Sequence, residues 1–439
     1  MSKEQPKAID LFCGAGGLSQ GLHDAGYEVL WGIDHEKNTK PTYDANHEHE
    51  MTVGDITETE PPDLGLETGE LDLVAGGPPC PTFSLVGRSK INSLEGRNNQ
   101  TDERHHLYED FLRFVDHYQP KAFLMENVEG MLSAENEDGE AVVDVITDQM
   151  ESLGYEVRVK LLDSANYGVP QHRKRLFFIG NRVGQENPDM DEWATHRAPK
   201  SESEKEIKFR EDPSKKTEED QSTLGGFAED EEHEEFPNFT PGGSKKPWNT
   251  VADAILNLPP VSPKGDTPPT KAEEYEIGPV SEYQYWVHDL SEDEDWEDQT
   301  LKNHECRGHN MRDLTLYKLL GEGVSYIIGD IPEEHQPYRT DIFPDKLKKQ
   351  NPKEPSTTIV AHLYKDGHMF IHPTEARSIT VREAARLQSF RDSFEFPVAR
   401  THAFKQVGNA VPPLLAQALG TAIREEVLEE AEPLLENAD

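Results

Sequence analysis

The amino-acid sequence predicts an α/β fold built around an open, doubly wound sheet. Short apolar runs of strand length recur along the N-terminal part of the chain, each run ends at a polar residue, and the first run breaks into a glycine-rich turn that opens a helix. Ligands of such sheets bind beyond the carboxyl ends of the strands. The sequence therefore predicts one crevice that gathers the residues ending the strands.

The first predicted strand, residues 7–12, contains Asp10 and leads into the glycine-rich turn 13–17. The glycines let the backbone approach a ligand closely, and the helix starting near Leu18 turns free N–H groups toward it. An ordinary turn is the alternative for a Gly-x-Gly sequence, so the turn indicates a cofactor loop only together with the next strands.

The second and third predicted strands end at carboxylates. Residues 28–33 lead to Asp34, where a doubly wound fold places an acid on ribose hydroxyls. Residues 51–54 lead to Asp55 and Ile56, an acid beside an apolar side chain that could flank an adenine ring. This spacing predicts an adenosine-type cofactor.

A stiff Gly-Pro turn carrying Cys80 follows the fourth apolar run, residues 71–75. A cysteine on a rigid loop at a strand end is typical of a covalent nucleophile. The alternative is a buried cysteine in a turn, since free cysteine is among the most buried residue types.

Two further segments carry polar groups toward the predicted crevice. The apolar run 122–125 ends at Glu126, which a helix N-terminus could also favour. Arg173 and Arg175 precede the apolar strand 176–180, and their alternation predicts that both point to one face, with a solvated basic strand as the alternative. We expect the strand-end residues to converge on one site, namely Asp10, Asp34, Asp55, Cys80 and Glu126.

With these motifs in order, the chain resembles the DNA (cytosine-5) methyltransferases. The resemblance covers about residues 8–180 and 372–415. It is carried by Asp-Leu-Phe-x-Gly-x-Gly-Gly at 10–17, Pro-Cys at 79–80, Glu-Asn-Val at 126–128, Gln-x-Arg-x-Arg at 171–175, and the segments 377–390 and 406–413. The chain departs from the family pattern at Pro81, where glutamine is common, and at Arg391, where proline is usual.

The resemblance implies a Rossmann-like S-adenosylmethionine-dependent methyltransferase sheet with a smaller target-recognition domain. It implies that Cys80 adds to carbon 6 of a flipped-out cytosine and that Glu126 holds the ring nitrogen and amine. Arg175 would contact the base carbonyl, and Arg173 would help build the pocket. The implied cofactor contacts are Asp10, Phe12, Gly14, Gly16, Gly17, Asp34, Asp55, Ile56, Pro79, Leu107, Asn409 and Val411.

The matched blocks divide the chain into expected domains. Residues 1–195 and 372–439 would form one catalytic domain, because the helix after Pro412 is expected beside the first strand. An acidic low-complexity insertion is predicted at 196–240 and the target-recognition domain at 241–371, including a helix start at 248–255, a strand at 356–360 and a hairpin around 365–367. The segment 85–106 has the composition of a lid. Arg382 and Glu383 are expected to tie the two domains together.

Double-stranded DNA is the expected partner. The candidate DNA contacts are Ser84, Arg88, Arg97, Arg307 and Arg339, and solvated surface residues are the alternative for the arginines of the recognition domain. The monomeric enzyme would be an orphan or would share its site with a cognate restriction endonuclease. A tRNA methyltransferase of the same architecture and a catalytically silent DNA-binding relative are the alternative functions.

The net charge is unusual for a DNA-binding protein. The 439 residues contain 85 Asp and Glu against 44 Lys and Arg, a net charge of −41. This excess predicts a halophilic cytoplasm, where salt screens repulsion, and disordered acidic insertions are the alternative.

The three cysteines, Cys13, Cys80 and Cys306, form no C-x-x-C pair, which favours a reducing cytoplasm without disulfides. No metal site is expected, although His304, Cys306 and His309 are closely spaced. The sequence offers no signal peptide and no apolar run of membrane-spanning length.

Overall fold

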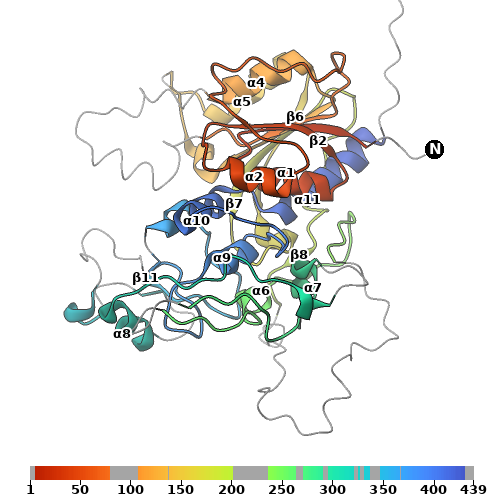
Figure 1. Cartoon of the computed structure of the whole chain (residues 1–439). Coiled ribbons are helices and arrows are strands. Elements are labelled where there is room, and N and C mark those ends of the chain that lie inside the picture. The colour runs from red at the N-terminus through yellow and green to blue at the C-terminus, as the bar shows by residue number, and fades with distance from the viewer. Residues whose placement is uncertain are drawn as a thin grey trace, which may run out of the picture.

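The structure is a computed structural model. It describes residues 5–79, 107–136, 138–200, 236–263, 270–289, 295–320, 325–326, 331–336, 347–365 and 367–430. The described chain forms a large sheet with helices on both faces and a second, less regular layer of helices and loops below it (Figure 1).

The main sheet has seven strands in the order β3-β2-β1-β4-β5-β7-β6. Their bounds are β1 Lys7–Leu11, β2 Glu28–Asp34, β3 Thr52–Val53, β4 Leu73–Gly76, β5 Ala122–Val128, β6 Glu156–Asp163 and β7 Lys174–Asn181. All neighbours among β1 to β5 pair in parallel, whereas β7 runs antiparallel to both β5 and β6. The sheet is the predicted doubly wound α/β type, with its order reversing beside β1, which confirms the fold class.

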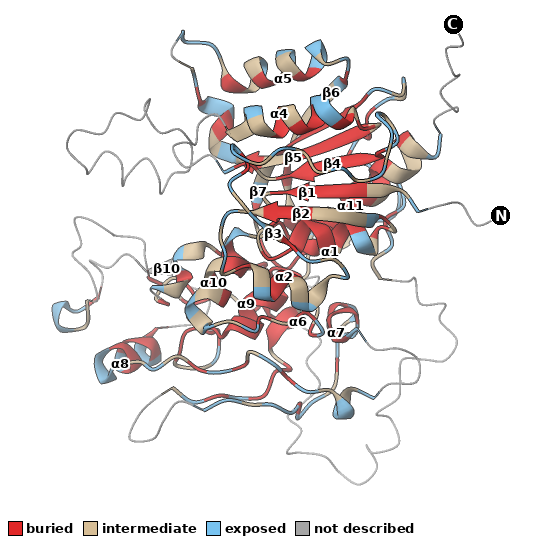
Figure 2. Ribbon diagram, turned by 45° about the horizontal axis from the view of Figure 1, so that its top comes forward, coloured by how far each residue is buried: buried red, intermediate tan, exposed pale blue. Residues whose placement is uncertain are grey.

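The buried strands show why near-continuous apolar runs form this sheet. Successive side chains of a strand point to opposite faces, and both faces of this sheet are covered (Figure 2). Ile9, Val74 and Phe123 pack with α4 and α5 on one face. Ala8 and Leu124 contribute to the core on the other face, together with residues of α1 and α11.

The helices that cover the sheet come from both ends of the chain. Their bounds are α1 Gly17–Asp24, α2 Lys40–Asn46, α4 Leu107–Tyr118, α5 Val142–Ser152 and α11 Pro413–Ile423, and the π-helical turn Arg424–Leu428 follows. The helix α10, Arg400–Asn409, lies below the sheet and packs on the 3-10 turn Ala361–Tyr364 (Figure 1). α11 lies directly against α1. A Cβ atom at Gly21 of α1 would approach the backbone oxygen of Pro413 to 2.4 Å, so this close approach requires glycine. The predicted return of the C-terminal segment to the first strand is confirmed.

The second layer contains shorter elements. They are β8 His196–Arg197, β9 Lys246–Pro247, α6 Val251–Ile255, α7 Glu282–His288, α8 Met311–Leu319, β10 Ser325–Tyr326, β11 Leu347–Lys348 and α9 Val381–Leu387. Single 3-10 turns cover Glu129–Ser133, Ser164–Tyr167, Trp296–Asp298, Glu333–His335 and Ala361–Tyr364. The core on the α1 side of the sheet continues into this layer through Ile255, Leu301 and Ile359.

The local predictions for this layer have different outcomes. The helix start expected at 248–255 is confirmed, because α6 begins at Val251, where Thr250 and Asp253 form a capping box. The expected strand 356–360 is wrong: in the described chain only Ser356 forms a bridge, with Gln171, and the next residues bond to residues 171–173. The expected hairpin around 365–367 stays a prediction, because Asp366 lies outside the described residues.

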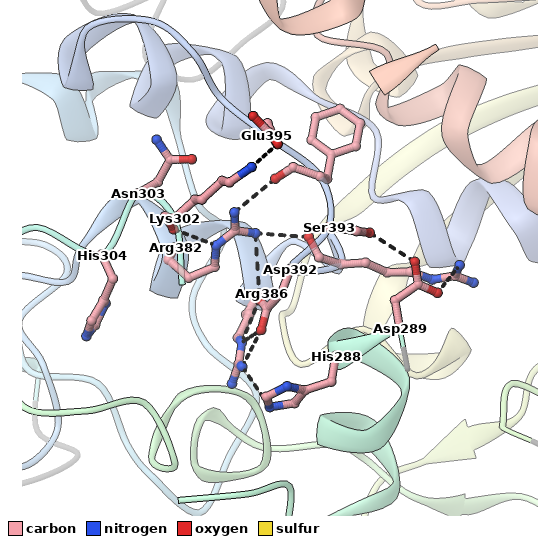
Figure 3. A network of polar contacts seen from close by, with 12 residues as sticks. His288, Asp289, Lys302, Asn303, His304, Arg382, Arg386, Asp392, Ser393 and Glu395 are labelled. Carbon is pink, nitrogen blue, oxygen red and sulfur yellow. Dashed lines mark hydrogen bonds and ion pairs between the residues drawn. The ribbon is translucent and has the colours of Figure 1, made fainter. Parts of the chain in front are cut away.

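A network of buried charges attaches α9 to the surrounding loops. Arg386 donates to both oxygens of Asp392 (Figure 3). It also donates to the carbonyl of Ala254. Arg382 donates to the carbonyl of Lys302 at 3.0 Å, which confirms the predicted tie at this residue. Glu383 instead accepts two bonds from Arg377 and caps its own helix.

Candidate active site

A cavity of about 380 Å³ lies at the carboxyl ends of β1, β2, β4 and β5. Residues 402–411 of the C-terminal segment complete its wall. The strand order reverses between β1 and β4, and a crevice at this point is where open α/β sheets bind their ligands. The predicted crevice therefore exists, and both ends of the chain build it.

Many of the residues singled out in the sequence line this cavity. They are Asp10, Phe12, Gly14, Asp34, Pro79, Glu126, Arg173, Arg175, Asn409 and Val411. Arg173 and Arg175 face the same cavity, as their alternation predicted. The sequence reasoning missed His35, Glu36, Asn38, Thr39, His402, Lys405 and Gln406, although the last of these begins a recognised motif.

Several other candidates lie away from the cavity lining. Gly17 packs against the carbonyl of Val411, which a Cβ atom would approach to 2.4 Å, and Gly16 packs against His47. Ile56 is buried, Leu107 packs at the edge of the same core, and Asp55 is exposed and bonds to Thr57.

Other candidates lie outside the described residues, namely Cys80, Ser84, Arg88, Arg97, Arg339 and the segment 85–106. Arg307 is described: its guanidinium donates to the carbonyl of Tyr364 at 2.5 Å and lies over the ring of Phe404.

The glycine-rich turn is held by the acid that ends β2. Asp34 accepts from the backbone N–H of Gly14 at 3.0 Å and from that of Glu36 at 2.7 Å. Phe12 has φ 61° and Gly14 has φ 56°, both in the left-handed region. A Cβ atom at Gly14 would meet nothing within 4 Å, so the backbone there is open toward a ligand.

Two acids lie at the turn: Asp10 is buried, and Asp34 is largely buried with Nδ1 of His35 3.5 Å from its Oδ1. Burial raises the pKa of Asp10 to about 7, and the neighbouring charge of Asp34 adds to this rise. Burial likewise raises the pKa of Asp34. This end of the cavity therefore favours a positively charged ligand, which would relieve both carboxyl groups.

Glu126 and Arg175 form the opposite end of the cavity. Arg175 Nε lies 3.0 Å from Glu126 Oε1, and both side chains are largely buried. The carboxylate is held on a strand and lies close to the backbone of Gly77. Asn127 donates to the carbonyl of Pro78 at 3.1 Å and so fixes the turn that leads to Cys80.

Arg173 joins the sheet to two distant segments. Its Nη1 donates to the carbonyls of Ile359 and Gly408, at 3.0 and 3.2 Å. The side chain is buried, and its Nε finds no hydrogen-bond partner in the described part of the chain. Burial, with the nearby charge of Arg175, lowers the pKa of Arg173. The guanidinium thus adds positive potential to the cavity wall.

The three residues considered as metal ligands have other partners. His304 bonds to Thr380 and to the carbonyl of Pro259, and His309 bonds to Ser378. Cys306 is buried. No group of three or more metal-ligating side chains occurs among the residues that the structure describes. Within the same residues, no helix is long and apolar enough to cross a membrane.

The sheet and its cavity define an α/β protein that binds a ligand at the switch point of a mostly parallel sheet. The family model for C-5 cytosine-specific DNA methylases matches residues 6–425. The chain therefore belongs to this family.

Similar proteins agree with the family match. The chain is 32% identical to the type II methyltransferase M.AgeI of Thalassovita gelatinovora, over 95% of this chain and 99% of that protein. It is 31% identical to the type II methyltransferase M.DdeI of Desulfomicrobium norvegicum, over 94% and 88%. A solved structure of a candidate DNA modification methyltransferase from an E. coli prophage shares the fold, with a TM-score of 0.62 and 22% identity over 97% of this chain.

The protein is a DNA (cytosine-5) methyltransferase related to the type II modification enzymes. Among the functions left open by the sequence, the family match selects DNA methylation over tRNA methylation and over a silent binding protein.

Proposed function

We propose that the protein transfers a methyl group from S-adenosylmethionine to carbon 5 of a flipped-out cytosine within one double-stranded DNA sequence, through a covalent bond to Cys80. The observation that carries this proposal is the cavity, which has two buried acids at one end and the Glu126–Arg175 pair at the other. The Pro79 rim of the same cavity leads directly to Cys80 in the sequence.

The acidic end of the cavity fits the cofactor. Asp34 would hold the ribose hydroxyls. Each of its carboxylate oxygens accepts one backbone hydrogen bond, from Gly14 or from Glu36, and can accept another from a ligand. The open backbone at Gly14 and the apolar side chains of Phe12 and Val411 would surround the remainder. When bound, S-adenosylmethionine supplies an electrophilic methyl group.

The opposite end fits cytosine. The Cys80 thiolate would add to carbon 6, which makes carbon 5 nucleophilic enough to accept the methyl group. Glu126 would hold ring nitrogen 3 and the exocyclic amine, and Arg175 both orients this carboxylate and contacts the base carbonyl. Loss of the carbon 5 proton then allows the Cys80 sulfur to leave. The positive charges of Arg173 and Arg175 favour the thiolate.

The target cytosine must leave the duplex, at a cost of a few kcal/mol, before Cys80 can reach it. We propose that residues 241–371 form the target-recognition domain, which binds the DNA around the flipped-out cytosine. Residues 196–240 would be an acidic insertion. The enzyme would act in the cytoplasm as a monomer, beside a restriction endonuclease that cuts the same sequence.

The covalent step is tested with Cys80→Ser. Bisulfite sequencing of plasmid DNA that carries the gene first identifies the methylated sequence. The unchanged protein should form a denaturant-resistant adduct with DNA that carries 5-fluorocytosine, because fluorine cannot leave carbon 5 as a proton does. We expect Cys80→Ser to bind the cofactor but to lose both methyl transfer and this adduct. The matched control is Cys306→Ser, which changes a buried cysteine outside the cavity lining and should keep both activities. Turnover by Cys80→Ser at the rate of the unchanged protein would contradict the mechanism.

A further inference from the structure

A chain of hydrogen bonds leads from the cavity to the protein surface on a route separate from the cavity mouth. Ser19 Oγ and Asp10 Oδ2 lie 2.6 Å apart, so the Ser19 hydroxyl donates to Asp10 when this carboxyl is ionised and can accept its proton when it is protonated. The Oη atom of Tyr43 lies 2.9 Å from Ser19 Oγ. Nε2 of His49 lies 2.9 Å from the same Tyr43 oxygen. Each link is short enough for a proton to pass along it.

The two ends of this chain have different environments. Asp10 lines the cavity, and Asp10, Ser19 and Tyr43 are all buried. His49 is half-buried and does not line the cavity. A proton that leaves Asp10 along this route therefore reaches solvent at His49 without crossing the space that a ligand would fill.

The groups that face Asp10 leave its carboxyl protonated until a positively charged ligand lowers its pKa. Asp34 ends the adjacent strand, Cys13 lies in the turn, and Tyr43 comes from α2. None of these three carries a positive charge, and Asp34 adds a negative one. Burial raises the pKa of Asp10 to about 7, so this carboxyl stays protonated below that pH.

The groups at the far end favour release of the proton to solvent. Burial lowers the pKa of His49, against the opposing charges of Asp44 and Glu48. The ring of His47 is tilted against that of Tyr43, with centroids 4.3 Å apart, and its pKa is lowered to about 4, again chiefly by burial. Neither imidazole is held in its charged form, so His49 can accept a proton and pass it on to water.

We propose that Asp10 loses a proton when the positively charged methyl donor fills the cavity, and that this proton leaves through Ser19, Tyr43 and His49. The carboxyl O–H bond of Asp10 breaks as the proton moves to Ser19 Oγ. The Ser19 hydroxyl proton moves to Tyr43 Oη, and the Tyr43 hydroxyl proton moves to Nε2 of His49, which returns it to water. The inference rests on the proposed cofactor and makes Asp10 a positioning residue that accepts the donor only in its ionised form.

The equilibrium part is tested by calorimetry of cofactor binding in buffers of different ionisation enthalpy. At about pH 6, below the pKa of Asp10, we expect release of about one proton per cofactor, and at about pH 8.5 we expect none. Asp10→Asn should release none at either pH. Cofactor binding without any proton release at about pH 6 would overturn the inference and leave the proposed function intact, whereas absence of binding would count against the proposed function itself.

The route is tested by stopped-flow binding with Tyr43→Phe, which removes the middle link and keeps the ring. Its matched control is Tyr155→Phe, which removes a buried hydroxyl that bonds to the carbonyl of Pro120 outside the cavity lining. We expect Tyr43→Phe to bind the cofactor several-fold more slowly at about pH 6 and at an unchanged rate at about pH 8.5, where Asp10 is already ionised. Tyr155→Phe should bind normally at both pH values.

Two results of the kinetic test would overturn the route. One is a Tyr43→Phe defect of equal size at both pH values, which would mean that the variant only disturbs packing. The other is a wild-type rate for Tyr43→Phe at the lower pH, which would mean that the proton leaves through the cavity mouth. Circular dichroism of each variant establishes that the fold is retained.

Discussion

Two groups of buried charge in this molecule differ in how they are compensated. Behind α9, Asp392 lies against Arg386 and Arg382, and these arginines hold its pKa well below the usual range. Within the part of the chain that the structure describes, neither Asp10 nor Asp34 is paired with an arginine, although His35 lies beside Asp34, and burial raises the pKa of both acids. The charge of the first group is balanced by arginines of the protein, whereas the charge of the second group is balanced only when a ligand supplies a positive charge.

This difference separates scaffold from site. A buried carboxylate with two arginines locks the loops around α9 in one arrangement, because breaking such a pair leaves an uncompensated charge. A buried carboxylate without a cation destabilises the folded chain at neutral pH and is retained where a ligand relieves it. Substitutions in the two groups should therefore change stability in opposite directions.

The largest expected effect is at the compensated group. Asp392→Asn should lower the free energy of unfolding by about 3–5 kcal/mol, because Arg382 and Arg386 would stay buried without their counter-charge. Urea denaturation at pH 8 measures this change.

The control for Asp392→Asn is Glu395→Gln, which breaks an exposed ion pair with Lys302 and should cost at most about 1 kcal/mol. Equal losses in the two variants would show that the network behind α9 contributes no more than a surface pair.

The next effect has the opposite sign. The folded-state pKa of Asp10 is about 7, above the unfolded value of about 3.9, so the folded chain holds an extra proton between these values and loses stability as pH rises through them. Asp10→Asn cannot ionise and should be more stable than the unchanged protein at pH 8, by on the order of 2–4 kcal/mol. The two proteins should be equally stable near pH 4, and a loss of stability at pH 8 would refute the uncompensated state of Asp10.

A smaller effect should appear in ligand affinity. Asp34→Ala removes the carboxylate proposed to hold the ribose and should weaken cofactor binding by about 1.5–3 kcal/mol, the range for a lost hydrogen bond to a charged group. Calorimetry measures the affinity, and an unchanged value would remove Asp34 from the site. Asp55→Ala, at an exposed acid outside the cavity lining, is the informative comparison.

The cavity was easier to predict than the network. Strand ends gather at one edge of a parallel sheet, so Asp10, Asp34 and Glu126 could be placed together from spacing alone. The arginines beside Asp392 are near it in sequence, but they also bond to the carbonyls of Ala254 and Lys302, at least 80 positions away, and no local pattern predicts these contacts. Of the two residues expected to tie the domains, Arg382 and Glu383, only Arg382 bonds to the loop at Lys302.

The failure of the strand prediction at residues 356–360 has a tertiary cause. Thr357 to Val360 have strand-forming side chains, but Thr357 bonds to the side chain of Gln350, and Thr358 and Ile359 bond to His172 and Gln171. Tertiary contacts thus override β-propensity, which reflects packing more than an intrinsic preference of the backbone. The same contacts bring the carbonyl of Ile359 to Arg173 at the cavity wall.

The same comparison extends to salt, because exposed charges respond to screening and buried ones respond little. We propose that the excess of 85 acidic over 44 basic residues suits a high-salt cytoplasm. Added KCl should then raise stability and methylation together at first, whereas DNA-binding proteins ordinarily lose affinity steeply between about 50 and 200 mM salt. Highest activity in dilute buffer with an equally folded protein would contradict the proposal.

The smallest effect in the salt series concerns a single exposed pair at the cavity. Lys405 of α10 donates to Glu36 at 2.6 Å, and both side chains are partly exposed. A double-mutant cycle with Glu36→Gln and Lys405→Met should give a coupling of about 0.2–1 kcal/mol in dilute buffer. Molar KCl should abolish this coupling, because the Debye length falls to about 3 Å. The stability loss caused by Asp392→Asn should stay within about 0.5 kcal/mol of its low-salt value, since Asp392 and its arginines are buried. If KCl reduced both this loss and the Glu36–Lys405 coupling free energy, the network behind α9 would be open to solvent, and the contrast between the two charge groups would fail.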